Sequence, residues 1–128
     1  MEPGVVWTWI TGTNNAGEWY ENDRVILWEG APANYVIGLG VIRDPFIGYN
    51  AKGKREYDME FLTKALEPEI TKERLLDNPV VRDASFLKRG NASGVVPLRN
   101  DDAAEIYRMI SELEPSSASI WPDLQSGA

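Results

Sequence analysis

The 128-residue chain contains neither cysteine nor histidine. Without thiolates or imidazoles, the commonest transition-metal sites and the usual nucleophile–base pairs of enzymes cannot be assembled. The lack of cysteine also excludes a disulfide framework and favours a protein of the reducing cytoplasm. These absences turn the interpretation away from catalysis. We expect a binding domain with no cofactor, no metal and no enzymatic activity of its own.

Long apolar runs are missing as well. No stretch approaches the roughly 20 apolar residues of a membrane span, and the first four residues do not form a signal peptide. With 43% hydrophobic and 26% charged residues, the composition is that of an ordinary globular protein. The length fits one domain. The sequence therefore predicts a single soluble, cytoplasmic domain without a membrane contact.

Positive charge is scarce, since 13 lysines and arginines stand against 20 aspartates and glutamates. Nucleic-acid binders gain much of their affinity by neutralising phosphates, so a chain of net charge −7 would have to recognise a base instead. Local basic clusters would then hold the flanking phosphates. The candidates are Lys52, Lys54 and Arg55, and a second cluster of Lys88 and Arg89. A solvated loop is the alternative explanation of each cluster.

Tryptophan, by contrast, is concentrated near the N-terminus. Four of the five tryptophans fall within the first 28 residues, at Trp7, Trp9, Trp19 and Trp28. Indole faces stack well on planar ligands, and each stacked base contributes about 1–3 kcal/mol. If the strands that carry Trp9 and Trp28 are neighbours, these two rings and Trp19 could line one mouth. Core packing, or a lid over the core edge for Trp19, is the alternative.

A polar loop lies beside these rings. It contains Thr13, Asn14 and Asn15, and an asparagine amide offers the donors and the acceptor that read a base edge. A turn-forming asparagine pair is the alternative.

The sequence gives little support to an enzyme. Gly38 and Gly40 lie inside a predicted strand and lack the third glycine of a dinucleotide fingerprint. Asp58 and Glu60 are explained as exposed charges on one strand face.

The pattern of residues predicts short strands interleaved with two helices. Strands are expected at residues 5–11, 24–28, 35–42, 57–61 and 94–98, with a long connection over residues 44–55. The short link between the second and third strands indicates an antiparallel hairpin. Gly38 and Gly40 would ease a tight bend in the third strand. The expected class is α+β, with a curled or barrel-like, mostly antiparallel sheet.

Two helices carry recognisable start and stop signals. Thr71 can cap the first, with Ile70 and Leu75 at the positions of a hydrophobic staple and Asn78-Pro79 as its stop. The second has capping-box spacing at Asp102 and Glu105 and ends before Pro115. Its apolar stripe comprises Ile106, Met109, Ile110 and Leu113. The Ser-rich residues 116–128 read as a linker stub that docks through Ile120 and Trp121.

Three stretches together resemble the EVE domain, a member of the PUA-like superfamily that also includes YTH domains. Residues 9–15 are similar to the family's first strand and polar loop, residues 22–28 with 35–42 to its Gly-Asp-x-Val hairpin, and residues 93–98 to its closing strand. Asn22 stands where the family usually has glycine, and the loop before Trp19 is shorter than in YTH domains. The likeness covers roughly residues 5–113.

The resemblance implies a PUA-like pseudo-barrel of about five or six mostly antiparallel strands with flanking short helices over residues 1–114, followed by a tail at residues 115–128. It further implies a pocket for one flipped, modified base. Carried over by position, Thr13 and Asn14 contact that base, while Trp19 and Trp28 match aromatic walls; Trp9 joins them from the first strand. Similar domains serve as sensors of modification-dependent restriction enzymes, whose nuclease lies in another domain.

The sequence therefore predicts a non-catalytic reader of DNA that carries 5-methylcytosine or 5-hydroxymethylcytosine, with N6-methyladenine as a further candidate. A reader of a modified RNA base is one alternative. A protein-interaction module whose tryptophans form a groove is another, and an enzyme acting through carboxylates is the least favoured.

Overall fold

A computed structural model describes residue 4 and residues 6–10, 20–30, 32–53, 55–88 and 98–122, with the backbone alone at residues 6–10, 85 and 88. The strands and helices, in chain order, are β1 (Val6–Ile10), β2 (Arg24–Glu29), β3 (Tyr35–Tyr49), β4 (Arg55–Phe61), α1 (Lys72–Leu76), α2 (Ser85–Lys88), α3 (Asn100–Leu113) and the 3-10 helix η2 (Pro115–Ser119). The class is α+β, as predicted. In the described part of the chain no helix has the length and apolar character needed to cross a lipid bilayer.

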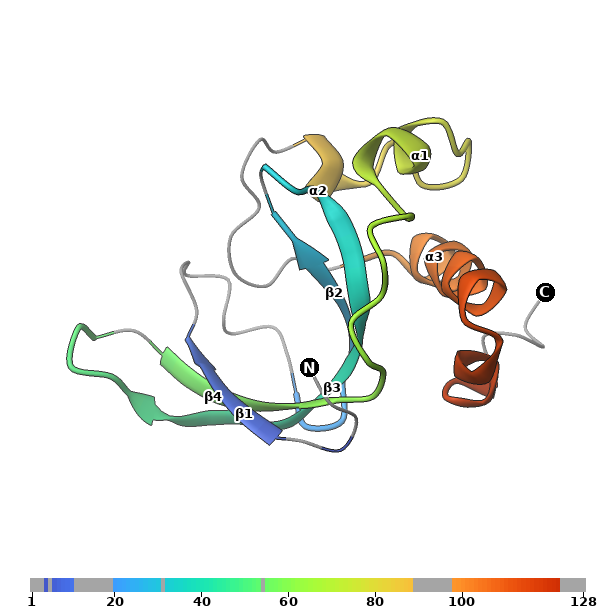
Figure 1. The fold of residues 1–128 in the computed structure, drawn as a ribbon. Helices are drawn as coiled ribbons and strands as arrows, with labels where there is room; N and C mark the ends of the chain where they lie inside the picture. Colours follow the sequence, from blue (N-terminus) through green and yellow to red (C-terminus); the bar gives the residue numbers. More distant parts are fainter. Residues whose placement is uncertain are drawn as a thin grey trace.

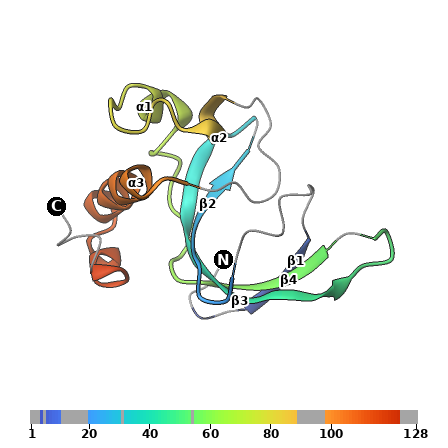
Figure 2. The ribbon, with the colours of Figure 1, turned by 180° about the vertical axis from the view of Figure 1, so that it is seen from behind.

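All four strands form one antiparallel sheet in the order β1-β4-β3-β2. The sheet bends strongly along β3, so that β2 and the first part of β3 form one limb while β4, β1 and the rest of β3 form the other (Figure 1). The same angle between the two limbs is seen from behind (Figure 2). Within the described residues the ladders do not close into a barrel, and the predicted strand at residues 94–98 lies outside them except for Leu98.

Gly40 lies at the corner between the two limbs. It pairs with Val25 of β2 on one side and with Phe61 of β4 on the other. A Cβ atom at this position would lie 3.0 Å from the carbonyl oxygen of Glu60 and 3.2 Å from the Sδ atom of Met59. Because a Cβ atom would be in tight contact with the neighbouring strand, glycine eases the close approach of β3 and β4 at the bend.

β3 is much longer than predicted, and the expected connection over residues 44–55 is wrong. The strand continues to Tyr49, where it pairs with Arg55. The turn signals at Pro45 and Gly48 belong to a bulge instead. Gly48 lies four residues after Asp44, but their partners in β4, Glu56 and Asp58, are only two residues apart. Bulges are where strands accommodate proline and glycine. Only residues 50–54 link the two strands of this hairpin.

The helices cover one face of the limb formed by β2 and β3 (Figure 1). α3 contributes Ile106, Met109 and Ile110 to the main core, as its apolar stripe predicts, and Leu113 packs at its edge. The predicted capping box is wrong, because α3 begins at Asn100, two residues before Asp102. Asp102 therefore lies in the first turn, where a carboxylate interacts favourably with the helix dipole.

α1 follows its predicted signals closely. The Thr71 side chain accepts a hydrogen bond from the backbone amide of Arg74 at 3.2 Å and caps the helix. Ile70 and Leu75, the expected staple pair, are both fully buried. The helix ends at Leu76, shortly before Asn78-Pro79.

The chain after α3 turns back onto that helix, and docking through Ile120 and Trp121 is confirmed. Trp121 is buried, and its ring centroid lies 5.4 Å from that of Tyr107. The Tyr107 hydroxyl donates to the carbonyl oxygen of Ser117 at 2.6 Å and accepts from the amide of Trp121 at 2.9 Å. Ile120 packs at the edge of the main core.

Candidate nucleic-acid interface

The sheet face opposite the helices is the concave side of the bend, and it carries a second apolar cluster. Its buried members are Leu27, Ile42, Tyr57, Met59 and Phe61, which come from three strands. Burial raises the pKa of the Tyr57 phenol above its ordinary value of 10. A phenol is protonated at physiological pH even at its ordinary pKa, and burial strengthens this preference.

β1 brings the backbone of Trp9 to the limb that β4 forms. Trp9 lies opposite Tyr57 in the antiparallel ladder, and Trp7 lies opposite Met59. The condition that the first two strands are neighbours is not met, because β1 and β2 stand at the two ends of the strand order. A ladder between these strands therefore cannot gather the tryptophans. The bend of β3 is what sets the two outer strands at an angle to each other (Figure 2).

Trp28 lies near the end of β2, where it pairs with Val36 after a shift in register. Its half-buried ring packs against the main core and meets Phe86 of α2 edge to face, with centroids 5.2 Å apart and planes at 74°. Trp28 thus belongs to the helical side of the sheet, at the rim next to α2. Among the described residues its aromatic partner is Phe86, which the sequence did not single out.

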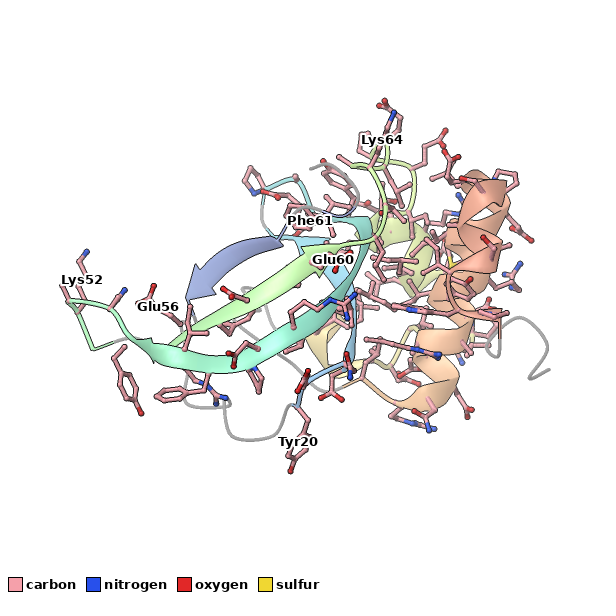
Figure 3. The ribbon with its side chains drawn as sticks, turned by 90° about the horizontal axis from the view of Figure 1, so that it is seen from below. Tyr20, Lys52, Glu56, Glu60, Phe61 and Lys64 are labelled. Carbon is pink, nitrogen blue, oxygen red and sulfur yellow. The ribbon has the colours of Figure 1, made fainter. Side chains whose placement is uncertain are left out.

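One of the predicted basic clusters is on the hairpin that joins β3 to β4. Lys52 is exposed in its turn, at the end remote from the helices (Figure 3). Arg55 begins β4 and is half-buried; its Nε atom donates to the carbonyl oxygen of Pro45 at 2.9 Å. Its guanidinium also lies 5.6 Å from the centroid of the Phe46 ring. Arg55 is therefore held in place by its own hairpin.

The other predicted site residues lie outside what the structure describes. They are Thr13, Asn14, Trp19, Lys54 and Arg89, together with the side chains of Trp9 and Lys88. The backbone at Lys88 ends α2. The structure therefore places Lys52 and Arg55 on one hairpin, and among the described residues it gives no contact between them and Trp28.

Acidic residues follow the convex face of β4. Glu56, Asp58 and Glu60 alternate with the buried residues of that strand, and Asp44 of β3 pairs with Asp58. Figure 3 looks onto this underside and shows Glu56 and Glu60 along the strand. Glu60 pairs with Arg43, whose Nε atom lies 2.7 Å from the carboxylate. In the described part of the chain no group of three acidic residues is arranged to hold a metal ion.

Sequence reasoning missed three apolar residues of the same hairpin. Phe46, Ile47 and Tyr49 are 48%, 43% and 67% exposed. The signal was present, since residues 45–55 combine these side chains with three basic residues and no acidic one. It was overlooked because Pro45, Gly48 and Gly53 made the segment look like an ordinary loop.

A second cluster of charges joins α3 to the turn after α1, beside a shallow groove. Arg108 donates to both carboxylate oxygens of Glu105, at 2.7 and 2.8 Å, and also pairs with Glu112. Asn78 donates to Glu105 from the other element at 2.6 Å. The hydrogen bonds from Arg108 and then Asn78 lower the pKa of Glu105 to about 2, although burial opposes the shift. These groups satisfy one another, which is typical of a structural cluster.

The chain was also compared with known proteins. Neither family models, nor curated proteins, nor solved structures gave a match to it.

Proposed function

We propose that this protein is a non-catalytic reader of a modified base in DNA, acting in the cytoplasm as the sensor of a modification-dependent restriction system. The base would be 5-methylcytosine or 5-hydroxymethylcytosine, with N6-methyladenine as the third candidate, flipped out of the duplex into an aromatic pocket. The nuclease would lie in a fused or associated domain. In this proposal the fold is a PUA-like pseudo-barrel that residues 94–98 help to close. The base contacts are those of Trp9, Thr13, Asn14, Trp19 and Trp28.

The distribution of charge over the bent sheet is the observation that carries the proposal. Carboxylates line the convex face of β4, whereas Lys52 and Arg55 lie on the hairpin at the outer end of the same limb. A polyanion is repelled from the first surface and attracted to the second. The concave side is therefore the favourable approach for a DNA strand, in spite of the net charge of −7. Because Trp28 lies on the helical side of the sheet, a captured base would contact it only at the rim next to α2.

The energetics of base capture agree with an aromatic pocket. Flipping a base costs a few kcal/mol, and stacking on aromatic rings returns about 1–3 kcal/mol per base. A buried methyl group adds only about 1 kcal/mol, whereas a hydroxyl that meets a placed polar group discriminates more sharply. Few phosphates would be neutralised, so we expect the affinity to depend only weakly on salt.

Fluorescence anisotropy with labelled oligonucleotides tests the proposal. The probes carry a single 5-methylcytosine, 5-hydroxymethylcytosine, N6-methyladenine or unmodified base, in DNA and in matched RNA. Trp28→Ala should abolish the preference for the modified base. Phe86→Ala is the matched control, because it removes the ring that packs against Trp28 but leaves the indole. It should keep the preference even if the variant is less stable.

The outcomes of this screen distinguish the DNA reader from the RNA reader and the protein-interaction module. Unchanged preference in both Trp28→Ala and Trp19→Ala would refute the pocket. Tighter binding of the modified RNA would make the protein an RNA reader. If the wild-type protein binds no oligonucleotide at all, the reader proposal fails and the protein-interaction module takes its place.

A further inference from the structure

The distal part of the β3–β4 hairpin, residues 45–55, forms what we call the hairpin arm. It projects away from the helices (Figure 1). Phe46 and Tyr49 expose their rings to solvent while they contact each other edge to face, with centroids 5.2 Å apart and planes at 69°. Ile47 is exposed between them. Apolar side chains gathered on so small an exposed segment are typical of an interaction site.

The backbone of the hairpin arm builds this aromatic pair. In a regular strand, residues 46 and 49 would point to opposite faces, because side chains alternate. The bulge between Asp44 and Gly48 breaks the alternation, and Gly48 adopts a φ of +133°, which favours glycine. The Asp44 carboxylate accepts from the amide of Phe46 at 3.1 Å and fixes the start of the bulge. The two rings meet as a result.

Arg55 holds the pair from the opposite strand. Its guanidinium lies over the Phe46 ring at 5.6 Å, and its Nε atom is bonded to the carbonyl oxygen of Pro45. Tyr49 and Arg55 are paired in register, and Arg55 alternates onto the same face as Tyr57. The aromatic pair therefore continues the concave face to its outer end. Such a fixed pair loses little side-chain entropy when a ligand stacks on it.

The local charge identifies the kind of ligand. Residues 45–55 contain Lys52, Lys54 and Arg55 and no acidic residue, in a chain whose net charge is −7. Aromatic rings combined with a local excess of positive charge are the usual platform for the bases and phosphates of a nucleic acid. A purely apolar protein partner would be recognised without these cations.

We infer that the hairpin arm is a second DNA contact, on which a base of the strand that carries the captured base stacks. This inference rests on the proposed function. Extruding one base breaks the stacking of its neighbours, and the faces thus exposed need a new partner. The rings of Phe46 and Tyr49 supply it, while Lys52 lies close to a backbone phosphate. The hairpin arm reads no base identity, so it adds affinity but no preference.

Binding of single-stranded DNA by the whole chain tests this contact, because an unpaired base needs no flipping. The double variant Phe46→Ala/Tyr49→Ala should bind modified and unmodified strands at least fivefold more weakly, with the ratio between them unchanged. Tyr49→Phe keeps the ring and should bind normally. Leu76→Ala/Val80→Ala is the matched control, since these two apolar side chains are similarly exposed at α1 and the turn after it.

A salt titration tests the role of Lys52. Lys52→Ala should make the slope of log affinity against log salt shallower by about 0.7, as expected for one phosphate on a single strand. Lys64→Ala is the control, because Lys64 is exposed at the other end of β4 (Figure 3). It should leave the slope unchanged.

The outcomes separate this inference from the proposed function. If Phe46→Ala/Tyr49→Ala binds as tightly as the wild type, the hairpin-arm contact is refuted, whereas a surviving preference for the modified base upholds the reader. If the wild type shows no such preference yet the double variant loses affinity, the reader falls and the contact stands. Photocrosslinking of 5-iododeoxyuridine next to the modified base should label peptides that contain residues 45–53; labels confined to other peptides would overturn the contact.

Discussion

Replacement of Gly40 by alanine tests whether close packing at the corner of β3 shapes the sheet. The added methyl group would lie 3.0 Å from the carbonyl oxygen of Glu60 and 3.2 Å from the Sδ atom of Met59. The Met59 side chain is buried, and the carbonyl group belongs to the backbone of a paired strand. Both neighbours would have to shift by a few tenths of an ångström, and the carbonyl oxygen can do so only if the backbone of β4 moves with it.

The expected loss of stability follows from two opposing effects. Overpacking of this kind costs about 1–3 kcal/mol. Replacing glycine also reduces the entropy of the unfolded chain, which returns about 0.4–1 kcal/mol. We therefore expect Gly40→Ala to lower the free energy of unfolding by about 1–2 kcal/mol. For a domain of this size that corresponds to a fall in Tm of roughly 4–8 °C.

Urea and thermal denaturation followed by tryptophan fluorescence measure the effect. Gly30→Ala is the matched control, since a Cβ atom there meets no atom within 4 Å among the described residues, and its φ is not positive. That variant should be as stable as the wild type or slightly more stable. If Gly40→Ala proves as stable as Gly30→Ala, the reasoning about the corner is wrong.

Two further variants test the helical layer. Glu105→Gln should lower the free energy of unfolding by about 1–2 kcal/mol at pH 7. This value allows for the screening of the ion pair by solvent, because the Arg108 side chain is half exposed. Because the folded pKa of about 2 lies below the ordinary 4.5, this contribution is complete above pH 4.5 and is lost towards pH 2. Urea melts at pH 7, 4.5 and 3 should therefore show the difference from the wild type shrinking, and a constant difference would contradict the assignment. Tyr107→Phe should cost about 1–3 kcal/mol in the same melts, because the carbonyl of Ser117 and the amide of Trp121 lose their buried partner; the exposed Tyr49→Phe should cost nothing measurable, and equal stability of the two variants would refute this role.

Elements whose signals lie within a few residues of each other could be predicted from the sequence. The cap at Thr71 and the staple of Ile70 with Leu75 are examples, because all their contacts are local. The ends of β2 and β4 could also be predicted to within two residues. The hairpin of β2 with β3 followed from its short link.

Features that depend on a partner strand or helix could not be predicted in this way. The extension of β3 beyond Ile42 exists because β4 pairs with it on both sides of a bulge. Glu105 was expected to cap its own helix, but Arg108 and Asn78 engage its carboxylate instead. Local spacing cannot show which of several competing donors a carboxylate will meet.

The candidate site was predictable only in part for the same reason. The basic residues Lys52 and Arg55 lie on one hairpin, where the sequence predicted only a long connection. The alternation of β2 places Ile26 and Trp28 on the face opposite Val25 and Leu27, but which of these two faces the helices cover depends on distant elements that no local pattern reveals. The aromatic pair of Phe46 and Tyr49 arises from the bulge, so a reading of alternating residues separates two rings that the structure brings together.

The position of β1 has a consequence for the order of folding. The two hairpins of the sheet join neighbours in the chain, whereas β1 pairs with β4 across most of the first half of the sequence. Closing so long a loop costs more conformational entropy than forming a hairpin, and contacts between distant residues therefore form more slowly. We therefore expect β1 to dock late in folding and to detach early in unfolding. Its amides should exchange with solvent faster than those of β3, which makes the strand that carries Trp9 the most easily released part of the sheet.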